Sequence, residues 1–140
     1  MTWRYILPPL VAWLIAQVTK VVIGSLRTRR IDLRGLSSTG GMPSSHSAMV
    51  SALTATIGRI NGPDSAAFAV ALIFSFVVMY DAAGVRRAAG RQAAVLNRVV
   101  DDLFAQRGLQ EERLRELLGH TPVQVFAGAA LGIAIGLLFR

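Results

Sequence analysis

Four apolar stretches occupy most of this chain of 140 residues, and each approaches the length of a helix that crosses a lipid bilayer. About 20 residues are needed to cross a hydrocarbon core about 30 Å thick. The stretches run roughly from Tyr5 to Leu26, from Ser45 to Ile60, from Ser65 to Val85 and from Pro122 to Phe139. The second is the weakest, because serines and threonines dilute it. We predict an all-α fold, an integral membrane bundle of about four transmembrane helices.

Composition agrees with a membrane location, since 53% of the residues are hydrophobic. The alternative is a water-soluble helical bundle. The last stretch argues against it, because it holds no charge and carries Gly128, Gly132 and Gly136 at four-residue spacing. Such spacing forms a groove that lets a neighbouring helix approach closely, either within one chain or in a homodimer. The first stretch resembles a signal peptide, but it contains Lys20 and lacks an obvious cleavage site, so we expect a retained membrane helix.

The net charge of +7 comes almost entirely from arginine, and its distribution predicts the topology. The arginines gather in the two longer connecting segments, which lie on one side of the membrane if the chain crosses four times. The turn 61–64 then lies on the other side. The positive-inside rule makes the basic side cytoplasmic and both termini external, in a cytoplasmic membrane of the bacterial type. A re-entrant weak stretch would change the placement of the termini.

The segment from Arg86 to Gly119 alternates arginine with alanine, valine and leucine. We predict that it forms an amphipathic helix lying at the membrane interface. A solvated, salt-bridged connector is the alternative. With this helix added, the whole chain, 1–140, forms a single domain.

Two histidines precede or open apolar stretches. Gly40-Gly41-Met42-Pro43-Ser44-Ser45-His46-Ser47 breaks the chain with a tight turn whose serines can cap the next helix. His120 lies in a similar break, after Gly119 and before the cap residue Thr121 and Pro122. Both histidines are therefore expected at helix N-termini, which attract anions, on one side of the membrane. A capping loop with an incidental histidine is the alternative.

Further charged residues accompany them. Lys20 and Arg27 are seven residues apart, so they share a helix face and could hold an anion, although snorkelling would also explain them. Asp81 lies in apolar sequence just before Arg86 and Arg87, as a functional carboxylate or as a structural ion-pair partner. Cations, two imidazoles and helix N-termini suit phosphoryl transfer with a histidine nucleophile and a histidine acid. The arginines would repel a metal ion, and no metal or cofactor is expected.

These residues resemble the type 2 phosphatidic acid phosphatase (PAP2) superfamily, specifically its short divergent branch related to vanadium haloperoxidases. The first family signature is a lysine, six residues and Arg-Pro, which Lys20 and Arg27 match with Thr28 in place of proline. The second is Pro-Ser-Gly-His, which Pro43-Ser44-Ser45-His46 matches with Ser45 in place of glycine.

The third signature is Ser-Arg, five residues, His, three residues and Asp, and this chain matches only its second half. His120 aligns with the histidine, but Leu114 occupies the arginine position and Gln124 the aspartate position. We carry the arginine role to Arg86 or Arg87. Gln124 also completes a helix capping box with Thr121, so Asp81 or Glu116 is expected to support His120 instead.

The resemblance implies a metal-independent phosphatase of a lipid phosphate or an isoprenoid diphosphate. His120 would attack phosphorus, His46 would protonate the leaving oxygen, and the substrate would be held by Lys20, Arg27, Ser44, Ser45 and Arg86 or Arg87. The rival prediction is a catalytically weak or inactive membrane protein that binds anionic lipid headgroups or a partner protein. Nucleic-acid binding is disfavoured, because the arginines flank membrane stretches without a set of stacking aromatics.

Overall fold

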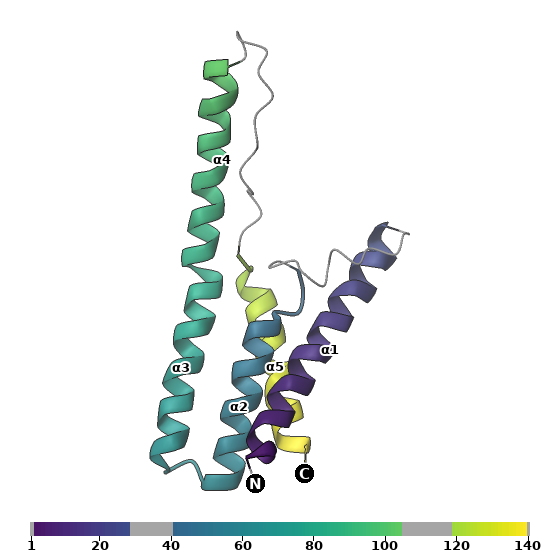
Figure 1. Ribbon diagram of the computed structural model, residues 1–140, viewed down its shortest axis with the longest axis vertical. Coiled ribbons are helices and arrows are strands. Elements are labelled where there is room, and N and C mark those ends of the chain that lie inside the picture. The colour runs from purple at the N-terminus through teal and green to yellow at the C-terminus, as the bar shows by residue number, and fades with distance from the viewer. Residues whose placement is uncertain (1, 29–40, 105–118, 140) are drawn as a thin grey trace.

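The computed structural model describes residues 2–28, 41–104 and 119–139, which form helices and turns (Figure 1). The helices are α1 (Trp3–Thr28), α2 (Ser45–Asn61), α3 (Ala66–Ala83), α4 (Val85–Phe104) and α5 (Pro122–Leu138). The predicted all-α class is confirmed, and all four apolar stretches are helical. Both ends of the chain lie at the same end of the bundle (Figure 1).

Hydroxyl side chains fix where three of these helices begin. Ser44, Ser65 and Thr121 are the N-caps of α2, α3 and α5, and each side chain accepts a hydrogen bond from the backbone N–H three residues later. A cap of this kind satisfies one of the amide groups that a helix start leaves without a partner. The serine and threonine positions in the sequence therefore set the helix starts closely.

Helix α2 lies at the centre and packs against α1, α3 and α5. Its hydroxyl side chains Ser47, Ser51, Thr54 and Thr56 are buried. Thr54 Oγ1 lies 2.8 Å from Ser75 Oγ of α3, and both hydroxyls also donate to backbone carbonyls. This helix has a low apolar content because it faces other helices rather than lipid, which explains why it was the weakest of the predicted spans.

The glycine row of α5 packs directly on α2. A Cβ atom at Gly128 would collide with the backbone of Ser44, and one at Gly132 would collide with Ala48. At Gly136 it would lie 2.6 Å from the carbonyl oxygen of Ala52. The groove therefore serves a contact within one chain, and the possible homodimer stays a prediction.

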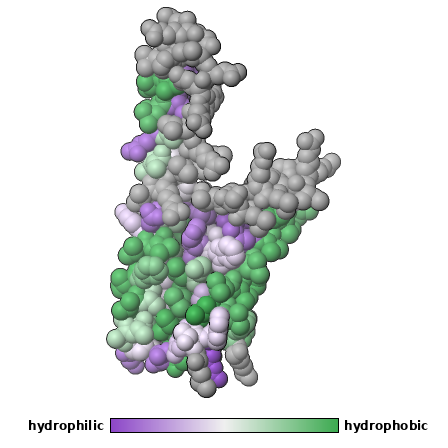
Figure 2. Space-filling view, viewed as in Figure 1, coloured by the Kyte–Doolittle hydropathy of each residue, from purple (hydrophilic) through white to green (hydrophobic). Residues whose placement is uncertain are grey.

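Much of the face of the bundle that Figure 2 shows is apolar, as expected for contact with lipid. On α3, Val70, Phe76 and Val77 are 70%, 58% and 60% exposed, and on α1 Leu14 is 53% exposed. Among the described residues, the helical stretches Trp3–Leu26 and Ala66–Asp101 are long and apolar enough to cross a membrane, whereas α5 is apolar but shorter. The fully spanning status of α2 and α5 stays a prediction.

Helix α4 does not take the orientation predicted for it. It continues the line of α3 beyond the rest of the bundle instead of lying across its end (Figure 1). The reason is local: Gly84 has the right-handed helical φ of −103° and ψ of −77°, its N–H bonds to Tyr80, and its carbonyl accepts from Ala88. The chain therefore passes from α3 to α4 almost without a turn. The remainder of the predicted amphipathic segment, 105–118, lies outside the described residues.

Candidate functional site

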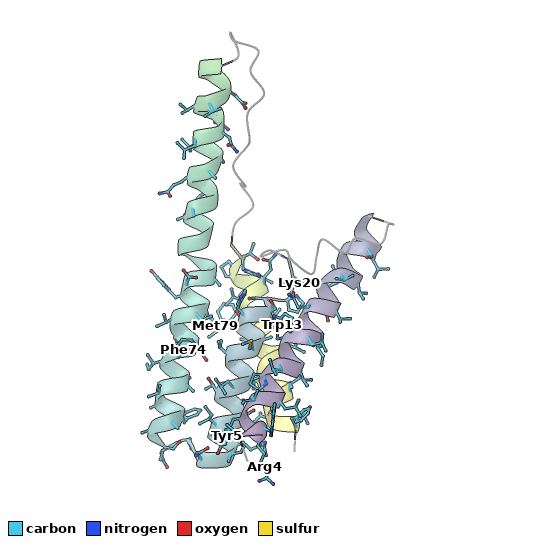
Figure 3. The ribbon with its side chains drawn as sticks, viewed as in Figure 1. Arg4, Tyr5, Trp13, Lys20, Phe74 and Met79 are labelled. Carbon is cyan, nitrogen blue, oxygen red and sulfur yellow. The ribbon has the colours of Figure 1, made fainter. Side chains whose placement is uncertain are left out.

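Among the described residues, Lys20, Ser45 and His120 lie at one end of the bundle, where α2 and α5 begin and α3 ends. Figure 3 shows Lys20 on α1 at this level, far from Tyr5 at the opposite end. The site lies at the end away from both chain termini (Figure 1). Residues that are distant in the sequence are joined here by the hydrogen bonds described below.

Lys20 joins α1 to the start of α2. Its side chain is only 6% exposed, and its Nζ donates a hydrogen bond to Ser45 Oγ at 3.3 Å. The side-chain methylenes of Lys20 also pass close to Gly41, whose φ of +93° favours glycine. This contact confirms that the first and second sequence signatures lie together. The side chain of Arg27 lies outside the described residues, so its role stays a prediction.

The segment 43–46 forms the N-terminus of α2. Ser44 is fully buried and accepts hydrogen bonds from the backbone N–H and the hydroxyl of Ser47. Ser45 is 2% exposed, whereas His46, in the first turn of α2, is exposed. The predicted capping turn is therefore confirmed, and it directs Ser44 and Ser45 into the protein and His46 toward the surface.

The second and third signatures are joined through the backbone. Ser44 N–H donates to the carbonyl oxygen of Gln124 at 2.9 Å, which fixes the start of α2 against the start of α5. Gly119 has a φ of +92°, and the following residue, His120, is 1% exposed. The backbone N–H of His120 donates to the carbonyl oxygen of Ala82 in α3 at 3.0 Å. Four helices therefore contribute to one site.

Gln124 completes the capping box of α5. Its Oε1 accepts from the backbone N–H of Thr121 at 3.0 Å, and its own N–H donates to Thr121 Oγ1 at 3.4 Å. The capping alternative raised from the sequence is confirmed. Because this side-chain oxygen is engaged at the helix start, Gln124 is accounted for without a role at the imidazole.

Of the remaining predicted site residues, the structure describes the side chain of Asp81 but not those of the others. Asp81 directly precedes Ala82 and so lies in the helical turn that contacts His120. Arg86 and Arg87 open α4 directly afterwards, but their side chains lie outside the described part of the chain, as does Glu116. Sequence reasoning missed Gln17, which is 7% exposed on α1, one turn from Lys20. Its position in the sequence, three residues before Lys20 in an apolar stretch, could have indicated that it faces the same side of the helix.

The electrostatics of this site favour an anion. The N-termini of α2 and α5 both lie here, and each carries a partial positive charge from the helix dipole. The ammonium group of Lys20 adds a full positive charge. Helix N-termini, a lysine and serine hydroxyls are groups that bind phosphate oxygens.

The sequence profile of the divergent PAP2 family matches residues 1–135. The chain belongs to this family. It is also 43% identical over 144 residues to "Uncharacterized membrane protein YuiD" of Bacillus subtilis (strain 168), an alignment that covers 95% of this chain and 91% of the relative. No solved structure matches the chain. The predicted resemblance to the divergent PAP2 branch is thus confirmed, and the chain is a membrane protein of that family.

Proposed function

We propose that this protein is a membrane-embedded, metal-independent phosphatase that hydrolyses a lipid phosphate or an isoprenoid diphosphate. The observation that carries the proposal is the convergence of Lys20, Ser45 and His120 at one end of the bundle. Lys20 bonds to Ser45, Ser44 bonds to Gln124, and His120 bonds to Ala82. Three distant segments therefore build one anion-binding site that contains a histidine.

In this proposal the phosphate group of the substrate is held by charge and by backbone amides. Lys20 and Ser45 contact its oxygens from the α1 side, and the start of α2 supplies N–H groups. Arg27 and either Arg86 or Arg87 complete the set. These cations also offset the charge that develops on the transferring oxygens, which is where electrostatic catalysis acts.

The chemistry proceeds in two steps. An imidazole nitrogen of His120 attacks phosphorus, the bond from phosphorus to the leaving oxygen breaks, and His46 donates a proton to that oxygen. Water then attacks the phosphohistidine, gives up a proton to His46, and the phosphorus–nitrogen bond breaks to release inorganic phosphate. With a diphosphate substrate, the first leaving group is the lipid monophosphate.

A phosphate carried by a lipid fits the position of the site at one end of an apolar bundle. Exposed apolar residues continue along α1 from Val18 to Leu26, past the level of Lys20. Lipid chains can therefore lie against the outside of the helix while the headgroup reaches the polar end. In this proposal the site end is cytoplasmic, as the positive-inside rule predicts from the arginine-rich stretches of the sequence.

One observation favours the rival proposal of a protein that binds anionic headgroups or a partner without turnover. His120 is 1% exposed, whereas a nucleophile must come within bonding distance of phosphorus. Under the rival proposal, Lys20, Ser45 and the exposed His46 form the binding surface, and His120 has a structural role.

Phosphate release by the purified protein in lipid vesicles separates these proposals. The substrates are a lipid phosphomonoester and an isoprenoid diphosphate, and the variants are His120→Ala and His46→Ala. We expect wild-type turnover and a loss of about 100-fold or more in each variant. Val70→Ala, a change of an exposed side chain on α3, is the matched control and keeps wild-type turnover.

A trapped phosphoenzyme tests the covalent step separately. Labelled substrate followed by rapid denaturation should give an acid-labile phosphoprotein in the wild type and in His46→Ala, but none in His120→Ala. Turnover that survives in His120→Ala would overturn the assigned nucleophile. A folded wild-type protein that binds the lipid phosphate but releases no phosphate from either substrate would establish the rival.

A further inference from the structure

Gln17 is a buried polar residue that the proposed chemistry does not use. It lies inside α1, in a stretch that is long and apolar enough to cross a membrane, and its side chain is 7% exposed. Moving an amide from water into an apolar environment costs free energy unless the group forms hydrogen bonds. Polar residues in membrane helices therefore face other helices or a functional site.

The position of Gln17 relative to Lys20 places it next to the proposed phosphate site. The two residues are three positions apart, so they are neighbours on the helix surface and lie about 4.5 Å apart along its axis. Lys20 bonds to Ser45 at the start of α2, and α1 runs toward this site from the opposite end of the bundle, where Tyr5 lies (Figure 3). Gln17 is therefore nearly one helical turn deeper in the bundle than the lysine that would bind phosphate.

Gln17 also lies at the edge of the buried face of α1, beside the surface that meets lipid. Its neighbours one turn earlier are Trp13 and Leu14, which are 39% and 53% exposed, and the adjoining Val18 is 50% exposed. Within the described chain, the helices that contact α1 are α2 and α5. A lipid against the exposed side of α1 is therefore separated from this amide by a side-chain rotation and not by another helix.

The two substrate classes of the proposed function differ at the depth of Gln17. In a glycerol lipid phosphate, ester groups follow the phosphate after a few bonds, and their carbonyl oxygens accept hydrogen bonds. In an isoprenoid diphosphate, hydrocarbon follows the diphosphate directly and offers no acceptor. A side-chain N–H one turn below the phosphate-binding lysine matches the first arrangement, because glutamine donates from its amide nitrogen.

We propose that Gln17 determines the substrate class: its side-chain N–H donates a hydrogen bond to an ester carbonyl oxygen of a glycerol lipid phosphate whose phosphate is held by Lys20 and Ser45. The residue contacts the part of the substrate that leaves with the oxygen protonated by His46, and it takes no part in the phosphoryl transfer. The choice of substrate for turnover rests on the proposed function, whereas recognition of the ester group in binding does not. A hydrogen bond between helices that only stabilises the bundle is the alternative role.

Two lipids that differ only in their carbonyl groups test the proposal. The substrates are a diacyl glycerol phosphate and its diether analogue with the same chains, presented to the purified protein in mixed detergent micelles. A neutral hydrogen bond contributes about a factor of ten, so we expect the wild-type kcat/KM to be about tenfold higher for the ester lipid. Gln17→Met keeps the length of the side chain and removes the amide, so the preference should fall below about twofold. Gln92→Met, which changes an exposed glutamine of α4, is the matched control and should keep the preference.

The wild type alone makes the proposal testable, even if Gln17→Met fails to fold. Equal kcat/KM for the two lipids would overturn it. Faster turnover of an isoprenoid diphosphate than of the diacyl lipid phosphate would overturn the assigned substrate class. In a folded Gln17→Met protein, equal losses on the ester and ether lipids would assign Gln17 to a structural hydrogen bond and reject its role in specificity.

Binding separates this proposal from the phosphatase proposal. The displacement of a fluorescent ether-linked lipid phosphate by each of the two lipids is measured in the same micelles and needs no turnover. A preference for the ester lipid that disappears in Gln17→Met, together with no phosphate release, would support the role of Gln17 and overturn the phosphatase. Phosphate release together with equal binding and equal kcat/KM of the two lipids would support the phosphatase and overturn the role of Gln17.

Discussion

Lys20 places a charged group inside a membrane helix, which costs free energy, and it also belongs to the proposed site. An ammonium group in the interior of a membrane helix costs about 3 kcal/mol on insertion scales, and it is retained where it has a use. Here it is 6% exposed and bonds to Ser45, the residue that replaces the glycine of the second PAP2 signature. The serine therefore holds the lysine at the start of α2.

Replacing Lys20 with methionine should separate stability from function. Lys20→Met keeps the length of the side chain and removes a buried charge, so we expect an unchanged or higher Tm in detergent. Phosphate binding should fall with it, and kcat/KM should drop about 100-fold, because a charged contact to the transferring group is lost. Thr19→Val on the same helix, whose hydroxyl bonds only within its own turn to Ile15, is the control. A Lys20→Met protein that retains full turnover would remove Lys20 from the site.

For the capping box of α5 we expect the reverse of the Lys20 result, a loss of stability without a loss of turnover. Gln124→Ala removes the oxygen that accepts from Thr121 N–H, so the free energy of unfolding should fall by about 1 kcal/mol. The kcat/KM should stay within about threefold of the wild type, since the amide serves the helix start. Thr121→Val removes the other half of the box and should give the same pattern in thermal unfolding and phosphate release. A loss of kcat/KM in Gln124→Ala as large as in His120→Ala would assign the amide to the imidazole after all.

At the scale of the helices, the α2–α5 contact depends on the absence of side chains. The buried glycines of α5 lie against the backbone of α2 at Ser44, Ala48 and Ala52. Close backbone approach compensates in lipid for the lack of a hydrophobic driving force between helices. The same contact positions the start of α2 against the start of α5, so packing and site geometry depend on one interface.

Gly132→Leu should separate these two helices. Its Cβ atom alone would collide with the backbone of Ala48, which cannot move as a flexible side chain can. We expect a loss of more than about 3 kcal/mol of stability, seen as a large drop in Tm and in the yield of folded protein. Gly24→Ala on α1 is the matched control, because a Cβ atom there meets nothing within 4 Å. That variant should be neutral or more stable by about 0.5–1 kcal/mol. An undiminished Tm in Gly132→Leu would contradict the packing of α5 on α2.

The helices themselves were predictable, because apolar length and N-cap residues are local signals. Ser44, Ser65 and Thr121 begin their helices where the sequence predicted. The direction of α4 was not predictable, since it depends on whether Gly84 adopts a helical or a turning conformation, and glycine permits both. The helix that packs on the glycine row of α5 and the burial of Gln17 depend on which helices contact each other. The periodicity of residues within one helix does not contain that information.

The site was predictable in part for the same reason. Lys20, Ser45 and His120 were found from their spacing and from the family resemblance. In the structure Lys20 bonds to Ser45, and the backbone of His120 bonds to Ala82 of α3. From the sequence, Gln124 could either cap α5 or take the place of the family's aspartate beside the histidine. Only the structure could separate these two roles, because the residue fits both sequence patterns. The contact of His120 with Ala82 joins residues far apart in the chain, so no local sequence pattern could predict it.

For the whole molecule, orientation in the membrane decides which compartment supplies the substrate. The turn at 61–64 and the polar site lie at opposite ends of α2, so they lie on opposite sides if α2 crosses the bilayer. The positive-inside rule predicts that the site end, next to the arginine-rich stretches of the sequence, is cytoplasmic. The absence of cysteine makes a direct test possible, since any introduced thiol is the sole one in the chain.

Two single-cysteine variants should report this orientation in intact bacterial cells. Asp64→Cys, at an exposed position in the α2–α3 turn, should react with a membrane-impermeant maleimide added outside. Arg91→Cys, at an exposed position on α4, should react only after the membrane is permeabilised. Labelling of Arg91→Cys in intact cells with protection of Asp64→Cys would reverse the topology and put the substrate on the outer leaflet. Equal labelling of both positions from one side would show that α3 does not cross the bilayer. The predicted bundle of four transmembrane helices would then be wrong.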